Sequence, residues 1–187
     1  MERLSAGFLI AMPQLGDPNF HRTVVLVLEH GAEGAVGLVL NRPAQVTLRD
    51  VARAQSLPVA EGLARQPVYL GGPVEPHRGF FLHDRTAVTE RHPIVPGVFL
   101  SEREGSLAEL LGAGEGSVRF FLGYAGWGPR QLEHELAQGT WLFTEATSDR
   151  VLRSDAGTLW DEVLRQMGVD PAMLQSPALR ENGQRTN

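Results

Sequence analysis

The chain has 187 residues, of which 42% are hydrophobic and 21% are charged, and its formal net charge is −5. This length suits one domain, and the apolar fraction is large enough for a packed core, which excludes a disordered or collagen-like chain. All 17 basic residues are arginine, and cysteine is absent. Schiff-base lysines, Walker-type phosphate loops, cysteine nucleophiles, thiolate zinc sites and disulfides are therefore excluded.

The first apolar run, residues 6–12, is interpreted as a strand. It is followed by Pro13, Asp17 and Pro18 and lacks the small-residue cleavage site of a secretory signal. No apolar stretch of the sequence reaches the roughly 20 residues that a membrane-spanning helix needs. We expect a cytoplasmic protein without membrane association.

The next two apolar runs predict a hairpin. Residues 23–28 are continuously apolar and β-branched, which is typical of a strand covered on both faces. A polar, glycine-containing turn at residues 29–34 leads to a second strand at residues 35–40. A short helix then begins at Thr47, which serves as N-cap with Asp50 three residues later, and continues to about residue 54.

The second half of the chain alternates short strands with short helices. Residues 55–66 are expected to form a loop, and the remaining strands are predicted at residues 67–70, 79–83, 97–101, 117–124 and 140–143. Helices are predicted at residues 106–111, 129–138 and 158–168. In the strand 117–124, alternation is expected to place Val118, Phe120, Leu122 and Tyr124 on one face and Arg119 and Phe121 on the other.

The order of these elements predicts the fold class. Strands grouped in pairs with a few intervening helices favour an α+β domain with a central, mostly antiparallel sheet, flattened and barrel-like, flanked by a few helices. We expect a single domain over residues 1–170 and a polar C-terminal tail over residues 171–187.

A glycine-rich segment at residues 122–133 is the first candidate binding region. Gly126 and Gly128 leave the backbone bare, and amide groups at the following helix start favour an anion. The glycine spacing differs from the dinucleotide-binding fingerprint and does not predict a Rossmann site. Trp127 has two open interpretations: it packs into the core beside a tight turn, or it covers a bound ligand as a lid.

Two other segments at predicted strand ends offer ligand contacts. Arg42 carries a planar guanidinium suited to a carboxylate or phosphate, while Asn41 before it is also typical of a turn. Gly71 and Gly72 expose backbone at a second strand end, although this pattern is common in ordinary loops. Turn chemistry and ligand binding explain Asn41 and Arg42 equally well, whereas Gly71 and Gly72 alone are a weak signal of binding.

The histidines give weaker signals. Gln138 stands where a metalloprotease helix beginning at His134 needs its second histidine, so that match is lost. His30 and His83 remain candidates for an acid/base pair with a nearby carboxylate, which would define a hydrolase-like enzyme. Because no G-x-S-x-G motif is present, we assign no catalytic residue, and we assign no metal or cofactor.

The charge pattern disfavours nucleic acid as a partner. The net charge is negative, lysine is absent, and the arginines are scattered along the sequence rather than gathered in a stripe. Phosphate contacts by basic residues supply most non-specific DNA affinity. A DNA-binding transcriptional regulator is therefore only an alternative.

Several motifs, in this order along residues 5–168, resemble the bacterial AlgH/YqgE family. They are Gly7-Phe8-Leu9-Ile10-Ala11-Met12-Pro13, Asp17-Pro18-Asn19-Phe20, Glu29-His30, Gly37-Leu38-Val39-Leu40-Asn41-Arg42-Pro43, Gly71-Gly72-Pro73-Val74, Leu82-His83 and Leu122-Gly123-Tyr124-Ala125-Gly126-Trp127-Gly128. Arg42 replaces a frequent lysine of that family, and Arg130 replaces a common glycine. The resemblance implies an α+β fold with a largely antiparallel sheet and a proposed regulatory role, and it supplies no catalytic residues.

We therefore expect a cytoplasmic regulatory or binding protein that holds a small anionic ligand or a protein partner. The groove would be lined by Asn41, Arg42, Gly71, Gly72, His83, Tyr124, Gly126, Trp127, Gly128 and Gln131. The hydrolase-like enzyme and the DNA-binding regulator are the alternatives. Whether the protein is an enzyme is left open.

Overall fold

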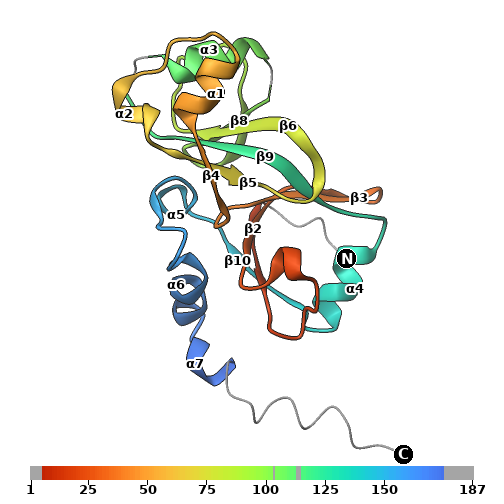
Figure 1. Ribbon diagram of the computed structural model, residues 1–187. Helices are drawn as coiled ribbons and strands as arrows, with labels where there is room; N and C mark the ends of the chain where they lie inside the picture. Colours follow the sequence, from red (N-terminus) through yellow and green to blue (C-terminus); the bar gives the residue numbers. More distant parts are fainter. Residues whose placement is uncertain (1–5, 103, 113–114, 175–187) are drawn as a thin grey trace, which may run out of the picture.

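The computed structural model describes residues 6–102, 104–112 and 115–174, which form one α+β domain around a curled sheet, a half-barrel (Figure 1). The strands are β1 (Gly7–Ala11), β2 (Val24–Gly31), β3 (Gly34–Val39), β4 (Pro43–Thr47), β5 (Pro67–Leu70), β6 (Val74–His83), β7 (His92–Val95), β8 (Val98–Ser101), β9 (Val118–Trp127) and β10 (Trp141–Glu145). The helices are a 3-10 turn (Pro18–Phe20), α1 (Leu48–Ala54), α2 (Glu61–Ala64), α3 (Glu104–Leu111), α4 (Gln131–Ala137), α5 (Ser148–Arg153), α6 (Leu159–Gln166) and α7 (Pro171–Leu174).

The sheet confirms the predicted fold class. Its main path runs β10-β1-β2-β3-β9-β6-β8-β7, and every pairing along it is antiparallel. Off this path, β5 pairs with β9 in parallel and with β4 antiparallel. The hairpin of β2 and β3 lies where the sequence predicts it.

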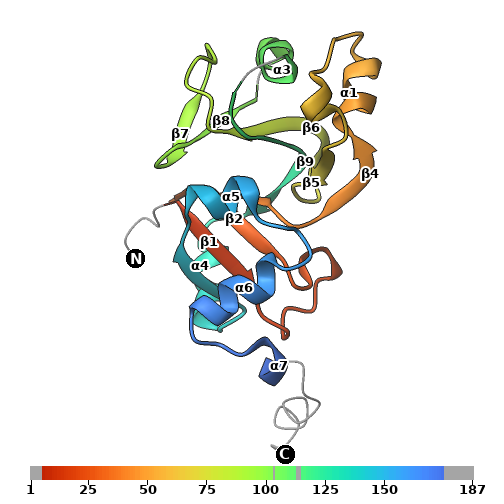
Figure 2. The same cartoon turned by 90° about the vertical axis from the view of Figure 1, so that its left-hand side faces the viewer.

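Helices cover both faces of the sheet. On one face, α5 and α6 pack against side chains from both halves of the sheet and form the shared cluster; Figure 2 shows α5 and α6 in front of β1 and β2. On the other face, α4 covers β1, β2 and β3 (the α4 cluster), and α1, α2 and α3 cover β5, β6 and β9 (the α1–α3 cluster). The continuous apolar run of β2 follows from this layering, because Val24 and Leu26 join the shared cluster while Val25 and Val27 join the α4 cluster.

The predicted cap of α1 is present. The carboxylate Oδ2 of Asp50 accepts hydrogen bonds from the Thr47 backbone N (2.9 Å) and hydroxyl Oγ1 (2.7 Å). These bonds hold the pKa of Asp50 below its ordinary value because they favour the charged carboxylate. The predicted helix at 158–168 is also confirmed as α6, with Leu159, Trp160 and Val163 buried.

Some elements differ from the prediction. The expected loop at 55–66 contains α2, and β6 begins at Val74 rather than at residue 79. The strands β4 and β7 and the helix α5 were not predicted, because each is short and begins next to proline or polar residues that resemble loop sequence. Residues 175–187, most of the predicted tail, lie outside the described residues, and residues 171–174 form α7.

The glycine-rich segment is a β-strand as far as Trp127, not a turn. The alternation of its side chains between the two faces of the sheet changes at Gly123. Phe120 and Leu122 belong to the α1–α3 cluster, as the alternation predicts. Tyr124, however, packs against the shared cluster on the opposite face. The expectation that Tyr124 shares a face with Leu122 is wrong because Gly123 has a φ of +69° and reverses the side-chain order.

Candidate functional site

Two of the sequence-predicted segments meet where the backbone of Gly71 and Gly72 crosses that of residues 122–125. The Gly71 amide donates to the Leu122 carbonyl (2.8 Å). A Cβ atom at Gly72 would lie 2.1 Å from the Tyr124 carbonyl carbon, and one at Gly123 would lie 2.4 Å from the Gly72 oxygen. These distances are far below van der Waals contact, so the crossing requires glycine at both positions. We name it the glycine crossing.

Asn41 and Arg42 lie beside the glycine crossing, because the Leu70 amide donates to the Arg42 carbonyl (2.8 Å). Their side chains bind the protein's own backbone. Asn41 accepts from the Val24 amide and donates to the Arg22 carbonyl, both at 2.9 Å. Arg42 Nη2 donates to the His21 carbonyl (2.7 Å). Both residues thus stabilise the turn before β2.

The same region exposes apolar side chains. Val46 on β4 and Leu70 on β5 are 41% and 50% exposed, and Met173 on α7 is the third large apolar residue described as exposed, at 68%. Leu70 pairs with the half-buried Leu122 of β9. We name Val46, Leu70 and Leu122 the β4–β5 apolar patch. Single exposed apolar side chains are common on protein surfaces, whereas a contiguous exposed apolar patch marks an interaction site.

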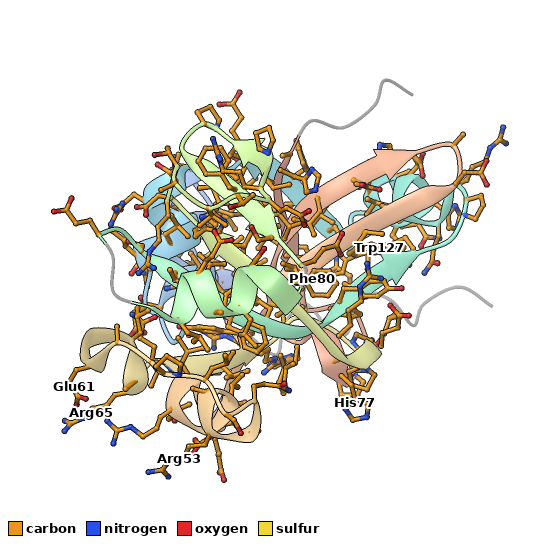
Figure 3. All side chains as sticks on the ribbon, turned by 90° about the horizontal axis from the view of Figure 1, so that it is seen from above. Arg53, Glu61, Arg65, His77, Phe80 and Trp127 are labelled. Atoms are coloured by element: carbon orange, nitrogen blue, oxygen red, sulfur yellow. The ribbon has the colours of Figure 1, made fainter. Side chains whose placement is uncertain are left out.

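Beside the glycine crossing, β6 bulges outward. Val74 pairs with Tyr124 and Gly79 with Leu122, so four residues of β6 stand against the single Gly123 of β9. Figure 3 shows the side chain of His77, in this bulge, projecting from the body of the protein, whereas Phe80 lies within it. The bulge is a second exposed feature of this region.

Arg78 fixes the base of the bulge. Its guanidinium donates to Glu75 (3.0 Å) and Glu102 (2.7 Å). It also lies over the rings of Phe80 (5.1 Å) and Tyr124 (5.9 Å). Ion pairs combined with cation–π contacts hold this arginine in one orientation. The ring of Tyr124 is therefore already in contact with the Arg78 guanidinium at the bulge.

Trp127 lies in the α4 cluster, away from the glycine crossing. Its indole is 7% exposed and packs between the rings of Phe20 and Trp141. The Nε1 groups of Trp127 and Trp141 both donate to Oε2 of Glu135, at 3.0 and 2.8 Å. This placement supports the interpretation of Trp127 as a core residue. Its hydrogen bond to Glu135 helps to hold α4 on the sheet.

The predicted amides at the start of α4 have a partner inside the protein. Gly128 N donates to Oε1 of Gln131 (3.0 Å), and Nε2 of Gln131 donates to Glu135 (2.9 Å). Gly126 is exposed and has ordinary space around its Cα. Arg130, just before the helix, has a φ of +62°, the left-handed region that glycine prefers.

The ten predicted residues are therefore not gathered into one groove. Asn41, Arg42, Gly71 and Gly72 lie at the glycine crossing with Tyr124. The second group, Gly126, Trp127, Gly128 and Gln131, runs from the end of β9 to the start of α4, and its first member, Gly126, also lies beside Tyr124. His83 pairs with Val118 at the opposite end of β9, roughly 20 Å along the strand from Tyr124.

His83 is completely buried and contacts a serine, not a carboxylate. Its Nε2 lies 3.0 Å from Ser101 Oγ, and that hydroxyl donates to the Glu90 carbonyl at 2.5 Å. Because that hydroxyl donates its proton to a carbonyl, Ser101 Oγ accepts from His83 Nε2–H. Burial lowers the pKa of His83. Because the serine proton is directed to a carbonyl, this pair does not form the serine–base arrangement of a hydrolase.

His30 makes the histidine–carboxylate contact that the hydrolase-like alternative needs. Its Nε2 lies 3.1 Å from Oε1 of Glu133, which connects β2 to α4. A hydrogen bond from its own backbone amide, together with His30, lowers the pKa of Glu133. The His30 side chain is only 3% exposed, whereas that of Glu133 is 25% exposed. A substrate would reach the carboxylate but not the imidazole.

Sequence patterns gave no indication that Arg119 is buried. Its Nε donates to the Leu152 carbonyl (3.0 Å) and its Nη2 to the Ser154 carbonyl, both at the C-terminal end of α5. The Tyr69 ring lies 5.1 Å below the guanidinium. Burial lowers the pKa of Arg119. Strand alternation places this arginine on the α5 face, where it binds the carbonyls that the helix leaves unpaired.

An open pocket of about 640 Å³ lies between the β6–β7 connection and the end of α3, outside the predicted site residues. It is lined by Asp84, Arg85, Thr86, Ala87, Val88, Glu109, Glu115 and Gly116. Arg85, 9% exposed, donates to the Leu110 carbonyl (3.1 Å). Because three carboxylates face one guanidinium here, the charge of the pocket disfavours an anion.

The described part of the chain contains neither a membrane-spanning helix nor a cluster of metal-binding side chains. In residues 6–102, 104–112 and 115–174, no helix has the length and apolar character needed to cross a bilayer. Over the same ranges, no group of three or more metal-binding side chains is placed to hold a metal ion.

The fold and the glycine crossing define a class of α+β proteins. In this chain the curled, mostly antiparallel sheet is crossed at β9 by the connection from β5 to β6, through glycines. A family model described as AlgH-like matches residues 8–172, and the chain belongs to this family. The resemblance seen in the sequence motifs is thereby confirmed.

Known relatives cover nearly the whole chain. A UPF0301 protein of Myxococcus xanthus is 58% identical over 174 residues, covering 93% of this chain and 96% of the relative. Another, from Methylococcus capsulatus, is 40% identical over 181 residues, covering 95% and 96%. The solution structure of the AlgH protein from Pseudomonas aeruginosa matches with a TM-score of 0.74 at 31% identity, covering 94% of this chain and 97% of that one.

Proposed function

We propose that this chain is a cytoplasmic binding protein whose partner is another protein, held at the β4–β5 apolar patch. The observation that carries the proposal is the exposure of Val46 and Leu70 on adjacent strands. Leu70 directly precedes the glycine crossing, which is built from motifs that carry the family resemblance, and Val46 lies on the neighbouring strand β4. A regulatory role would act through this partner.

The contacts of the polar groups favour a protein partner over a small anion. One N–H of Arg42 and the Gly128 amide, which the sequence offered to an anion, donate to His21 and Gln131. The open pocket carries more carboxylates than guanidinium groups. Covering apolar surface, by contrast, releases about 25 cal/mol for each Å² removed from water. The patch therefore suits an apolar segment of a protein.

The proposal is tested with Val46→Ser combined with Leu70→Ser. Because both side chains are exposed, we expect a change below about 0.5 kcal/mol for each in the free energy of unfolding. Proteins that co-purify with the tagged chain from its own cells are then quantified by mass spectrometry. We expect at least one protein to be retained by the wild type and lost from the double variant.

The matched control is Met173→Ser, which removes a more exposed apolar side chain on α7, away from the patch (Figure 1). Its set of co-purified proteins should equal that of the wild type. If the wild type, the double variant and the control retain the same proteins in the same amounts, the β4–β5 apolar patch is not the binding surface.

A further inference from the structure

In the described part of the chain, three strands border the sheet, each paired on one side. These are β10 and β7 at the two ends of the main path, and β4 beside β5. A bordering strand presents unpaired N–H and C=O groups, and natural proteins usually protect such edges with proline, bulges or charge.

Two of the three edges carry such protection. In β7, Pro93 interrupts the strand, and the pairing with β8 is irregular between residues 93 and 95. In β4, Pro43 begins the strand, and the pairing with β5 shifts register between residues 43 and 47. Proline and irregular pairing both hinder the addition of another strand.

The third edge, β10, carries neither device. All five of its residues, from Trp141 to Glu145, pair with β1 in unbroken register. The strand contains no proline, glycine or basic residue, and four of its five residues are Trp, Leu, Phe and Thr, which favour strands or pack well in them. Leu142 and Phe143 are half-buried and pack against opposite faces of the sheet.

The hydrogen-bond pattern shows which groups of β10 are free. Met12 N donates to the Thr140 carbonyl, so alternate residues from Thr140 onward face β1. Leu142 and Thr144 therefore bond to β1. The backbone groups of Trp141, Phe143 and Glu145 point away from the sheet, in a regular row of three.

This row is complementary to itself. When two copies of β10 run antiparallel with Phe143 opposite Phe143, Trp141 of each copy lies opposite Glu145 of the other. Three hydrogen-bonded pairs then form, with about six backbone hydrogen bonds. No two carboxylates lie opposite each other, so charge does not oppose the pairing. A two-fold axis through Phe143 generates this arrangement, as in most homodimers.

We propose that the β10 edge pairs with β10 of a second copy of this chain, in antiparallel register centred on Phe143, to form a continuous sheet across a dimer. The contact area of two five-residue strands is small, so the dimer is concentration-dependent. The proposal rests on β10 alone and does not depend on the β4–β5 apolar patch.

The first test uses cross-linking, for which the absence of native cysteine is an advantage. In the proposed register, Phe143→Cys places two thiols on directly opposite residues about 5.5 Å apart at Cα, within the range of a disulfide. We expect mild oxidation to give mostly covalent dimer. The matched control is Gln45→Cys on the exposed β4 edge, which should stay monomeric. Equal cross-linking of both variants, or none at residue 143, would overturn the proposal.

A second pair of variants tests the proposal even if Phe143→Cys does not fold. Glu145→Pro removes an exposed side chain and an outward amide, whereas Glu145→Ala removes the side chain alone. Circular dichroism checks that both are folded. In sedimentation equilibrium, the wild type and Glu145→Ala should form a monomer–dimer equilibrium, with the dimer constant of Glu145→Pro weakened at least tenfold. A wild type that stays monomeric, or an unchanged constant in Glu145→Pro, contradicts the proposed pairing.

Discussion

The glycine crossing and the junction between β9 and α4 are both rich in glycine. Glycine occurs at the two places for different structural reasons. At the crossing, a Cβ on Gly72 or Gly123 would overlap the opposing backbone. Between the end of β9 and the start of α4, Gly126 and Gly128 have only ordinary contacts around the corresponding Cβ position. Glycine is obligatory at the first place and tolerated at the second, so one sequence pattern does not have one structural meaning.

The largest expected effect is the loss of stability when alanine replaces a glycine of the glycine crossing, compared with the same replacement at Gly126. Gly72→Ala adds a Cβ 2.1 Å from backbone at a φ of +154°, and neither backbone can move without breaking the β5–β9–β6 sheet. We expect a loss of at least about 3 kcal/mol in the free energy of unfolding, or no folded protein. Gly126→Ala is the matched substitution, and its loss should stay below about 1 kcal/mol. Urea titration of both variants measures the difference; similar losses would remove the distinction.

The second effect concerns what holds α4 in place. Trp127→Ala removes a buried indole and its hydrogen bond to Glu135, so we expect a loss of about 3–5 kcal/mol. Trp127→Phe keeps an aromatic ring and should lose less. If Trp127 were a lid over a ligand, the alanine variant would unfold at the same urea concentration as the wild type.

A third prediction concerns how the buried His83 makes the free energy of unfolding depend on pH. Burial lowers the pKa of His83 below its ordinary 6.5, so between the two values the unfolded chain binds more protons than the folded one. The contribution of His83 to the free energy of unfolding is complete above pH 6.5 and is lost as the pH falls below it. His83→Gln should flatten the pH dependence of unfolding between pH 7.5 and 5.5. A slope in His83→Gln equal to that of the wild type would contradict this account.

The smallest expected effect is a gain in the free energy of unfolding. Arg130 has a φ of +62°, which costs about 1–2 kcal/mol for a residue other than glycine. Glycine removes this strain but loses more entropy on folding, so Arg130→Gly should stabilise the protein by about 0.5–1 kcal/mol. Arg165→Gly, at an exposed position in the last turn of α6, should instead destabilise it by up to about 1 kcal/mol. Thermal unfolding distinguishes the two, and equal destabilisation would contradict the strain at Arg130.

Periodicity predicted the elements that have strong apolar patterns. The runs of β1, β2 and β3 and the stripe of α6 are where the sequence places them, because each buries several side chains in regular order. The short elements β4, β7, α2 and α5 were missed, because four to six residues beside proline, glycine or polar residues give too little periodicity to distinguish them from loops.

The candidate site was less predictable than the fold. Sequence motifs identified Gly71, Gly72 and Arg42, which do lie together, since each follows a strand that ends in the same region. They gave no means to see that the side chain of Arg42 bonds to the turn at His21, or that Leu70 is exposed. Such contacts join segments distant in sequence, and only the three-dimensional arrangement determines them.

Site-specific photo-cross-linking from Leu70 in living cells is the most direct measurement of partner binding at the β4–β5 apolar patch. A photoreactive residue in place of Leu70 is compared with the same residue in place of Met173, the exposed apolar position on α7. We predict that the Leu70 position joins the chain to a discrete protein and that the Met173 position does not. Equal products from both positions, or none from Leu70 in a folded protein, would contradict the proposed binding surface.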